Sequence, residues 1–315
     1  MRIVIINILI FTILILLLEF TVRISKISSV QGVEKNLLNF SNKIILNRAN
    51  NETIVFGKKA FVDKNGFRVP VRNYKHKYRS SLLILGDSVS FGVGVDEDKT
   101  FPGILRKNSK VNIYNASVVG HNIIDYSFLI KNYYKNFNNL SRVIIMISLN
   151  DAHLSKGIIH NKELKNESYH IRTLKHINIF LRNKSALFVL LKSKFTKADE
   201  RHFNLLRNYY NDQEVLNKYK NTLKKIDQFS KSKNLKVNYI LLPYSFQIQQ
   251  NCNNDVLFPQ QIIKNIFYEL KMDVNDFTND FCIKNEKKLY LNYDPVHLSE
   301  KGHTFVYNLI VEKVF

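Results

Sequence analysis

Short apolar runs alternate along the chain with longer segments in which apolar residues recur every three or four positions. Runs of this kind predict buried strands, at 82–85, 111–115, 142–149 and 237–242. The periodic segments predict helices, at 98–107, 122–137, 258–270 and 299–314. Regular alternation of strand and helix is typical of a parallel sheet that is covered by helices on both faces.

The first residues form one long apolar segment. The run from 3 to 18 is broken only by Asn7 and Thr12 and ends at Glu19. With the residues that follow, it nearly reaches the roughly 20 residues that span a bilayer. A secretory signal peptide is the alternative, but no small-residue cleavage site follows. We therefore predict an uncleaved transmembrane signal anchor at 1–23. The flanking basic residues do not settle its orientation.

Residues 24–79 are predicted to form a stalk and a lead-in to the first core strand. Within this segment, 60–69 has the pattern of a hairpin that turns at Asn65-Gly66. Arg68 lies in the second half of the hairpin. An edge-strand position is the favoured interpretation of Arg68, and reach into a functional site is the alternative.

A helical insertion is predicted at about 152–234, because this stretch is too long for a simple crossover between two strands. It contains an apolar-rich helix at 177–194 and a longer helix at 203–229. The part at 156–196 is interpreted as a cap beside the site. A basic amphipathic segment can also rest on a membrane surface, and additional core helices are the third interpretation.

The strand at 82–85 stops abruptly at Gly86-Asp87-Ser88. Glycine permits a sharp turn, and open α/β sheets bind their ligands at the carboxyl ends of the strands. A serine there can lie at the start of the next helix, where free backbone N–H groups favour developing negative charge. Ser88 is therefore a candidate nucleophile, although Gly-Asp-Ser is also a common turn.

An aspartate and a histidine near the C-terminus complete this chemistry. A serine nucleophile needs a base, and the base needs a partner that fixes its tautomer. Asp294 lies three residues before His297, and Pro295 restricts the loop between them. A simple turn with a solvated histidine is the alternative for this segment alone. In combination with Ser88, the catalytic interpretation is favoured.

Four short blocks resemble those of the SGNH (GDSL-type) hydrolases and occur in the family's order. They are Gly-Asp-Ser at 86–88, Asn-Ala-Ser-Val-Val-Gly at 115–120, Ser-Leu-Asn-Asp at 148–151 and Asp-Pro-Val-His-Leu at 294–298, the last followed by Gly302-His303. The chain departs from the family pattern at Ser148, where the family has glycine. This departure puts a larger residue beside the expected oxyanion site.

The resemblance implies a role for each site residue. Ser88 would attack an ester carbonyl, His297 would act as general base and acid, and Asp294 would orient His297. The oxyanion hole would consist of the backbone N–H groups of Ser88 and Gly120 and the side-chain amide of Asn150. The reaction would pass through an acyl-enzyme and would need no cofactor and no metal.

The resemblance also implies fold and location. An SGNH-hydrolase-like (flavodoxin-like) three-layer sandwich with a central parallel sheet is expected over 80–315. Membrane-anchored relatives place this domain outside the cytoplasmic membrane, so it would be periplasmic or extracellular. The substrate would be an acylated envelope glycan, a lipid or a small ester. An O-acetyltransferase for cell-surface polysaccharide is the first alternative, and a non-catalytic, basic, membrane-associated protein is the second.

Charge and cysteine content narrow the partners. The 315-residue chain carries a formal net charge of +21, which favours anionic partners. Its Lys and Arg residues are scattered, however, and no nucleic-acid-binding motif is present, so no specific nucleic acid is expected. Cys252 and Cys282 form no Cys-x-x-Cys pair. A disulfide and two free thiols both remain open for them.

The other polar residues near the blocks have weaker claims. His121 and His153 are expected to be solvated loop residues, with a place in the pocket as the alternative. His303 is expected to pack against or cap the last helix. Asp87 and Asp151 are interpreted as structural residues that accept hydrogen bonds from loop N–H groups.

Overall fold

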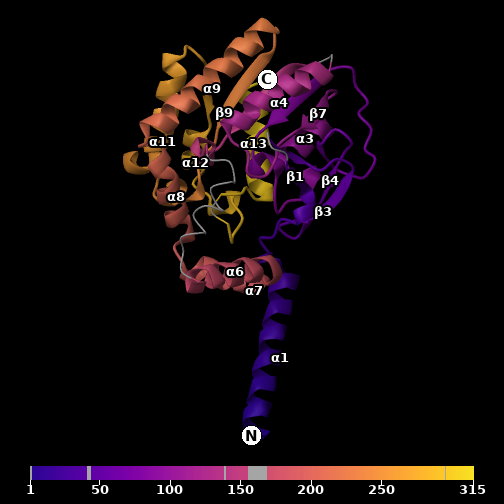
Figure 1. The fold of residues 1–315 in the computed structure, drawn as a ribbon, viewed down its shortest axis with the longest axis vertical. Helices are drawn as coiled ribbons and strands as arrows, with labels where there is room; N and C mark the ends of the chain where they lie inside the picture. Colours follow the sequence, from indigo (N-terminus) through magenta and orange to yellow (C-terminus); the bar gives the residue numbers. More distant parts are fainter. Residues whose placement is uncertain (1, 41–43, 138–139, 155–168, 295) are drawn as a thin grey trace.

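The computed structural model describes residues 2–40, 44–137, 140–154, 169–294 and 296–315, and shows a helix-covered sheet from which one long helix projects (Figure 1). Within these residues the main sheet has eight strands in the order β10-β9-β8-β6-β7-β5-β4-β3. The strands are β3 Asn51–Val55, β4 Lys58–Val62, β5 Arg68–Val69, β6 Ser81–Leu85, β7 Asn112–Asn115, β8 Leu140–Ile147, β9 Lys236–Leu241 and β10 Asn275–Asp276. A separate antiparallel pair joins β1 Leu38–Phe40 to β2 Ile45–Asn47.

The five strands from β10 to β7 are parallel. Numbered along the chain, they lie in the order 2-1-3-4-5, which is the flavodoxin-like order. Every residue of β6 is buried, as a strand with helices on both faces requires. The predicted α/β sandwich is confirmed, as are the four predicted strands, with ends displaced by one or two residues.

Helices cover both faces of the sheet. One face packs against α4 Ile123–Asn136, α8 Ala198–Tyr209, α9 Gln213–Ser232 and α11 Asn254–Glu269. The other packs against α3 Phe101–Asn108, α10 Ser245–Gln249, α12 Thr278–Lys284 and α13 Glu300–Lys313. Alternate residues of β6 serve the two layers: Leu83 and Leu85 face the first, and Leu82 and Ile84 face the second.

Polar capping residues determine where helices begin, and some observed ends therefore differ from those that periodicity predicts. The helix predicted at 98–107 begins at Phe101, because Glu97–Lys99 forms a 3₁₀ turn and the Thr100 hydroxyl accepts a hydrogen bond from the Gly103 N–H at 3.2 Å. The prediction for 299–314 is confirmed, with Ser299 capping α13.

Both helices predicted in the insertion are wrong as single helices. The stretch 177–194 is divided between α6 Tyr169–Lys184 and α7 Ala186–Phe195, because Ser185 caps the second helix. The stretch 203–229 is divided between α8 and α9, where Asp212 accepts hydrogen bonds from the first N–H groups of α9. Residues 155–168, which include the start of the predicted cap, lie outside the described part of the chain.

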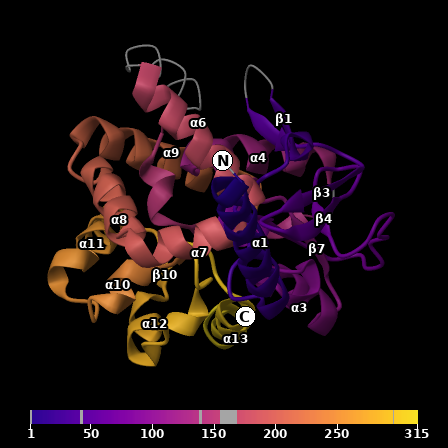
Figure 2. The ribbon, with the colours of Figure 1, turned by 90° about the horizontal axis from the view of Figure 1, so that it is seen from below.

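Helix α1, Arg2–Ser25, projects from the body, and almost all of its side chains are exposed. It is the one helix in the described residues that is long and apolar enough to cross a membrane, a property that a signal sequence would share. Helices α6 and α7 lie across its C-terminal end, as Figure 1 and the view from below in Figure 2 show. We call these two helices the platform.

Hydrogen bonds join α1 to the platform where α6 meets α7. The Glu19 carboxylate accepts from the Ser185 hydroxyl at 2.7 Å and from the N–H groups of Ala186 and Leu187 at 2.9 Å. Arg23 donates to the Lys184 carbonyl at 2.6 Å. The end of α1 thus occupies the N-terminus of α7, where free N–H groups favour a carboxylate.

The segment before β6 adds three strands to the sheet. The predicted hairpin is confirmed as β4 and β5, which pair antiparallel around a turn in which Gly66 has φ +86°. The edge-strand expectation for Arg68 is wrong, because β5 lies between β4 and β7. The buried Arg68 guanidinium donates to the carbonyl groups of Phe91, Gly92 and Val95, so it braces the loop that follows Ser88.

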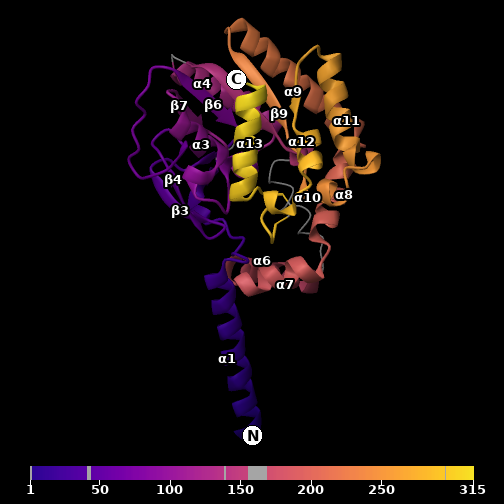
Figure 3. The same cartoon turned by 180° about the vertical axis from the view of Figure 1, so that it is seen from behind.

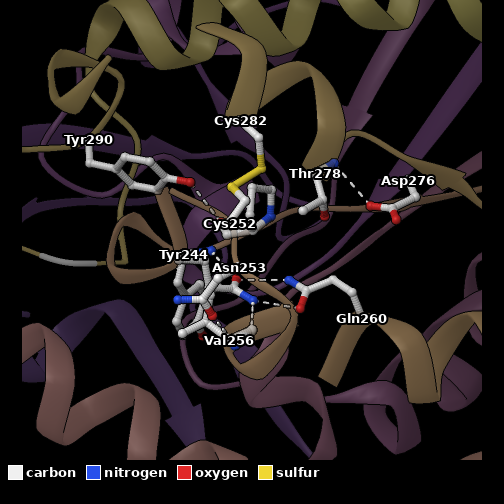
Figure 4. Close-up of a disulfide and its surroundings, with 11 residues drawn as sticks. Tyr244, Cys252, Asn253, Val256, Gln260, Asp276, Thr278, Cys282 and Tyr290 are labelled. Atoms are coloured by element: carbon white, nitrogen blue, oxygen red, sulfur yellow. Dashed lines mark hydrogen bonds between the residues drawn. A yellow bond between two sulfur atoms is a disulfide. The ribbon is translucent and has the colours of Figure 1, made fainter. Parts of the chain in front are cut away.

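A disulfide links Cys252, which follows α10, to Cys282 on α12, with a Cα–Cα distance of 6.0 Å. Figure 4 shows this bridge near Gln260, whose side-chain amide is paired with that of Gln247 at 2.6 and 2.8 Å. In the view from behind in Figure 3, α12 lies beside α13 on the near side of the sheet. The disulfide therefore ties together two short elements of this layer.

Candidate active site

Ser88 lies at the carboxyl end of β6, at the first residue of the short helix α2, Ser88–Phe91. The turn before it needs Gly86, since a Cβ atom there would lie 2.3 Å from the Ser90 hydroxyl. Asp87 fixes the turn by accepting a hydrogen bond from the Val89 N–H at 2.9 Å. Asn150 follows β8, which is the neighbour of β6. The strand order reverses between β6 and β8, and sheets of this kind usually bind their ligands at that point.

Asp294 and His297 lie in the loop before α13. The Asp294 carboxylate accepts from the N–H groups of Val296 at 2.9 Å and His297 at 3.0 Å, which turns it back along the chain. The same oxygen lies 2.7 Å from His297 Nδ1, and His297 Nε2 lies 2.9 Å from Ser88 Oγ. The structure therefore brings Ser88, His297 and Asp294 into one row of hydrogen bonds, while Pro295 lies outside the described residues.

Charge and burial shift the pKa values of Asp294 and His297 in opposite directions. Burial raises the pKa of Asp294, but the charge of His297 and the hydrogen bonds that the carboxylate accepts outweigh burial, so the pKa of Asp294 is lowered. Burial lowers the pKa of His297, but the charge and hydrogen bond of Asp294 outweigh it and raise the pKa above 6.5. The imidazolium form of His297 is thus stabilised by Asp294.

Gln31 supports the pair from a segment far away in sequence. Its side-chain N–H donates to the second Asp294 oxygen at 3.1 Å, and its side-chain carbonyl accepts from Arg182 Nε at 2.9 Å. Its backbone N–H also donates to the Arg182 carbonyl at 2.9 Å. Gln31 therefore connects Asp294 to the platform, a role that no motif in the sequence indicates.

The Asn150 side chain is held on both sides. Its amide N–H donates to Asp87 at 2.8 Å, and its carbonyl accepts from the Tyr244 hydroxyl at 2.8 Å. Since an amide carries two N–H groups, one remains for another acceptor. Ser148, the departure from the family pattern, is buried with its hydroxyl 3.4 Å from Asp87. Its side chain therefore lies behind Asn150, outside the cavity that Asn150 lines.

A cavity of about 350 Å³ lies in front of Ser88. We call it the Ser88 cavity. On the sheet side it is lined by Ser88, Asn150 and His297, and on the helical side by Arg182, Lys192 and Arg201. The His297 ring packs edge-on against Phe56, with ring centroids 5.2 Å apart. A substrate here would lie between the chemistry of the sheet end and the cations of the helices.

Gly120 is not among the described residues that line this cavity. It is an exposed residue in the loop after β7, with φ +86°, a conformation that favours glycine. The loop is held beside the strand end, where the Val118 N–H donates to the Gly86 carbonyl at 3.1 Å. The contribution of Gly120 to an oxyanion hole stays a prediction.

The remaining polar residues have structural places. His121 is buried, so its expected solvated position is wrong, whereas His153 is exposed and stacks on Tyr209. His303 packs in the core as expected, and burial lowers its pKa to about 3. Asp151 accepts from the Ser148 N–H and the Tyr126 hydroxyl, and burial raises its pKa.

Within the described ranges, no three His, Cys, Asp or Glu side chains lie together as a set of metal ligands. The side chains that face the Ser88 cavity are instead those of nucleophilic and acid–base chemistry. An aligned serine, imidazole and carboxylate can activate a hydroxyl and return its proton to a leaving group.

No protein-family model matches the chain, and no curated protein matches it in sequence. Solved structures with a similar arrangement include TesA, at 12% identity and a TM-score of 0.45 over 74% of this chain and 97% of that chain. The psychrotrophic esterase EstA from Pseudoalteromonas sp. is 13% identical, with a TM-score of 0.44 over 75% and 96%. The acetyl xylan esterase AlAXEase is 15% identical, with a TM-score of 0.45 over 74% and 100%. Likeness at this level assigns no activity.

Proposed function

We propose that the chain is a serine hydrolase of the SGNH (GDSL) type that cleaves ester bonds through an acyl-enzyme. The observation that carries the proposal is the row of hydrogen bonds from Ser88 Oγ through His297 to Asp294, with distances of 2.9 and 2.7 Å. Two segments 209 residues apart supply this row, and it faces a cavity large enough for a small ester.

In the first half of the reaction, Ser88 Oγ attacks the ester carbonyl while His297 Nε2 takes its proton. The Asp294 carboxylate, already bound to His297 Nδ1, stabilises the imidazolium that results. The oxyanion accepts hydrogen bonds from the free side-chain N–H of Asn150 and from the backbone N–H of Ser88. Each such donor contributes about 3 kcal/mol of transition-state stabilisation. The tetrahedral intermediate then collapses, and the alcohol leaves with the proton of His297.

In the second half, a water molecule replaces the alcohol. His297 accepts a proton from this water as it attacks the acyl-Ser88 ester. The second tetrahedral intermediate then collapses, His297 returns the proton to Ser88 Oγ, and the acid leaves. If a sugar hydroxyl took the place of water, the same groups would transfer the acyl chain instead.

Turnover of p-nitrophenyl acetate by the full chain in detergent micelles tests the proposal. We expect Ser88→Ala to lower kcat/KM at least about 10³-fold, as in other serine triads. Ser90→Ala is the matched control, since it removes a hydroxyl from the same short helix, outside the hydrogen-bond row. Equal rates for wild type and Ser88→Ala would refute the proposal, and acyl transfer to an added sugar in competition with water would identify the transferase alternative.

We further propose that α1 anchors the chain in a membrane with the body outside the cytoplasm. Two observations support this location: the length and apolar character of α1, and the disulfide between Cys252 and Cys282. Disulfides persist in oxidising compartments and are rare in the cytosol. Protease added to intact cells or spheroplasts should digest the body, whereas protection of the body until lysis would contradict the location.

A further inference from the structure

The helical side of the Ser88 cavity carries three cationic side chains. Arg182, Lys192 and Arg201 come from α6, α7 and α8, so three separate helices converge on the space in front of Ser88. A cavity with walls of low polarity focuses the field of such charges. Convergence of this kind differs from the scattered basic residues over the rest of the surface.

Within the described part of the chain, none of the three forms an ion pair with a carboxylate. Arg182 donates to the neutral side-chain carbonyl of Gln31, and Lys192 donates to that of Asn178 at 2.6 Å. The carboxylate that lines the cavity, Asp294, is bound to His297. Burial and the neighbouring charges of Arg182 and Arg201 lower the pKa of Lys192. The described residues that line the cavity therefore carry an excess of positive charge.

We propose that the Ser88 cavity binds an ester that also carries a carboxylate or phosphate group, held by Arg182, Lys192 and Arg201. This inference rests on the proposed ester hydrolysis and adds the class of substrate. Guanidinium groups bind carboxylate and phosphate in a fork of two hydrogen bonds, and a lysine adds a point charge. An uncharged ester would leave the three cations without an anionic partner among the described residues.

Binding to the full-length Ser88→Ala variant tests the anion site without any need for turnover. Phenyl phosphate and benzoate represent the two anions, and benzamide is the neutral compound of the same shape. We expect at least one anion to bind about tenfold or more tightly than benzamide in calorimetry, with a difference that shrinks as salt is added. Equal affinities for all three compounds would overturn the inference.

A charge-matched pair of variants shows where the anion binds. Lys192→Gln with Arg201→Gln removes two cations from the cavity, and Arg172→Gln with Lys184→Gln removes two exposed cations from α6 outside it. The first pair should abolish the preference for the anion, whereas the second should retain it. Equal loss in both pairs would mean that net charge, and not the cavity, attracts the anion, which would also overturn the inference.

Turnover separates this inference from the proposed function. We expect kcat/KM for 4-acetoxybenzoate or 4-acetoxyphenyl phosphate to exceed that for 4-acetoxybenzamide about tenfold or more. Comparison of the two anionic esters distinguishes carboxylate from phosphate. Hydrolysis of all three at equal rates, lost in Ser88→Ala, would leave the ester hydrolase standing and refute the anion site.

A second inference comes from the platform, which exposes several large apolar side chains. On α6 they recur every third residue, and α7 adds two more: Ile171, Leu174, Ile177, Phe180, Leu191 and Phe195. Leu174 is 66% exposed and Phe195 is 83% exposed. Apolar side chains in this number and exposure are typical of a surface that another apolar phase covers.

The position of α1 indicates that this apolar phase is a lipid bilayer. The platform lies across the end of α1, and Glu19 and Arg23 of α1 bind the junction between α6 and α7 (Figures 1 and 2). If α1 spans a bilayer, its end places the platform at the level of the lipid headgroups. We infer that the platform lies in the membrane interface, its apolar residues in lipid and those of its Lys and Arg residues that do not line the Ser88 cavity at the headgroups. This inference rests on the proposed membrane anchor.

The chain contains no tryptophan, so single tryptophans can measure depth in full-length protein in lipid nanodiscs. Leu174→Trp reports on the platform, Ile10→Trp on α1, and Tyr268→Trp on α11, where Tyr268 is 84% exposed. We expect lipids brominated near the headgroup to quench Leu174→Trp and lipids brominated deeper in the chain to quench Ile10→Trp, with Tyr268→Trp unaffected. An unquenched Leu174→Trp would refute the inference, whether or not Ile10→Trp shows that the anchor holds.

Discussion

The two walls of the Ser88 cavity are built differently. On the sheet side, Asp87, Asn150 and Asp294 each make two or more hydrogen bonds within the fold. On the helical side, the cations of α6, α7 and α8 lack carboxylate partners within the described residues, and the same helices expose large apolar side chains. The polar groups of the sheet side have their hydrogen-bond partners within the protein, whereas the cations and apolar side chains of the helical side can still bind a ligand or a surface.

This difference separates two tasks. Reacting groups must be held in a fixed geometry, because a small displacement of a nucleophile or base is costly in rate. Cations that have only neutral partners among the described residues can still bind an anionic ligand. We therefore propose that the sheet side carries the chemistry and that the helical side selects and places the substrate. Changes on the sheet side should alter kcat, and changes on the helical side should alter which ester is preferred.

The largest effect is expected when the charge partner of His297 is removed. Asp294→Asn keeps the shape of the side chain but loses the charge that stabilises the imidazolium, so kcat should fall about 10³- to 10⁴-fold. The rate of wild type should rise with pH as His297 loses its proton, with a midpoint above 6.5 because Asp294 raises the pKa of His297. Burial then dominates in Asp294→Asn, so the midpoint of its residual activity should move to lower pH.

Retention of at least a tenth of the wild-type kcat in Asp294→Asn would contradict the division between the walls. Gln249→Asn, on the exposed end of α10, is the control for a change of a side chain that does not line the Ser88 cavity and carries no charge.

The next effect concerns stability alone. Replacement of both Cys252 and Cys282 by serine opens a loop of 30 residues, which is expected to lower the free energy of unfolding by about 3 kcal/mol. The melting temperature should fall by roughly 5 to 10 °C. Because the disulfide does not border the Ser88 cavity, kcat at 25 °C should remain within about threefold of wild type.

Calorimetry of the double serine variant, and of wild type with a reducing agent, measures this shift. The two samples should melt together. An unchanged melting temperature in both would show that the bridge carries no stability, and a large loss of kcat in a folded sample would show that it supports the site.

The sheet side of the cavity could be predicted from sequence because its key residues lie in short, contiguous stretches of the chain. Strand β6 stands out because all of its residues are buried and four of the five are apolar, and the Gly-Asp-Ser turn follows it directly. Asp294 and His297 could be paired because they are three residues apart. The mixed edge of the sheet was harder, since β5 has two residues and its placement depends on the buried guanidinium of Arg68.

The helical side was less predictable, since its helix ends depend on single caps such as Ser185 and Asp212 inside continuous periodic patterns. No sequence pattern indicated a role for Gln31. Its role depends on α6 returning to a segment about 150 residues earlier in the chain, which is a tertiary contact without a local pattern.

Gln31 joins the two walls, so its replacement sharpens the comparison. Gln31→Ala removes the donor to Asp294 and the link to Arg182, and we expect kcat to fall about tenfold, the value of one hydrogen bond to a charged group. Gln31→Glu places a second negative charge near His297, which should raise the pKa of His297 and move the rising limb of the rate to higher pH.

A purely structural role for Gln31 would lower the melting temperature without moving the pH profile. Gln213→Ala, on the exposed start of α9, is the matched control and should alter neither. Identical pH profiles for wild type and Gln31→Glu would exclude the positioning role.

The smallest effect is expected at Tyr244, which holds the carbonyl of Asn150 at 2.8 Å. Tyr244→Phe keeps the ring and removes that bond, together with the bond that the hydroxyl accepts from the Asn150 backbone N–H at 3.2 Å. We expect kcat to fall about fivefold, with KM unchanged, because the bond that orients the amide contributes about 1 kcal/mol. The same change in an Asn150→Ala background should have little effect, since only the backbone bond is then lost. A fivefold loss in both backgrounds would show that Tyr244 acts through the backbone bond or through packing, and Asn150 would lose its place as the oriented donor.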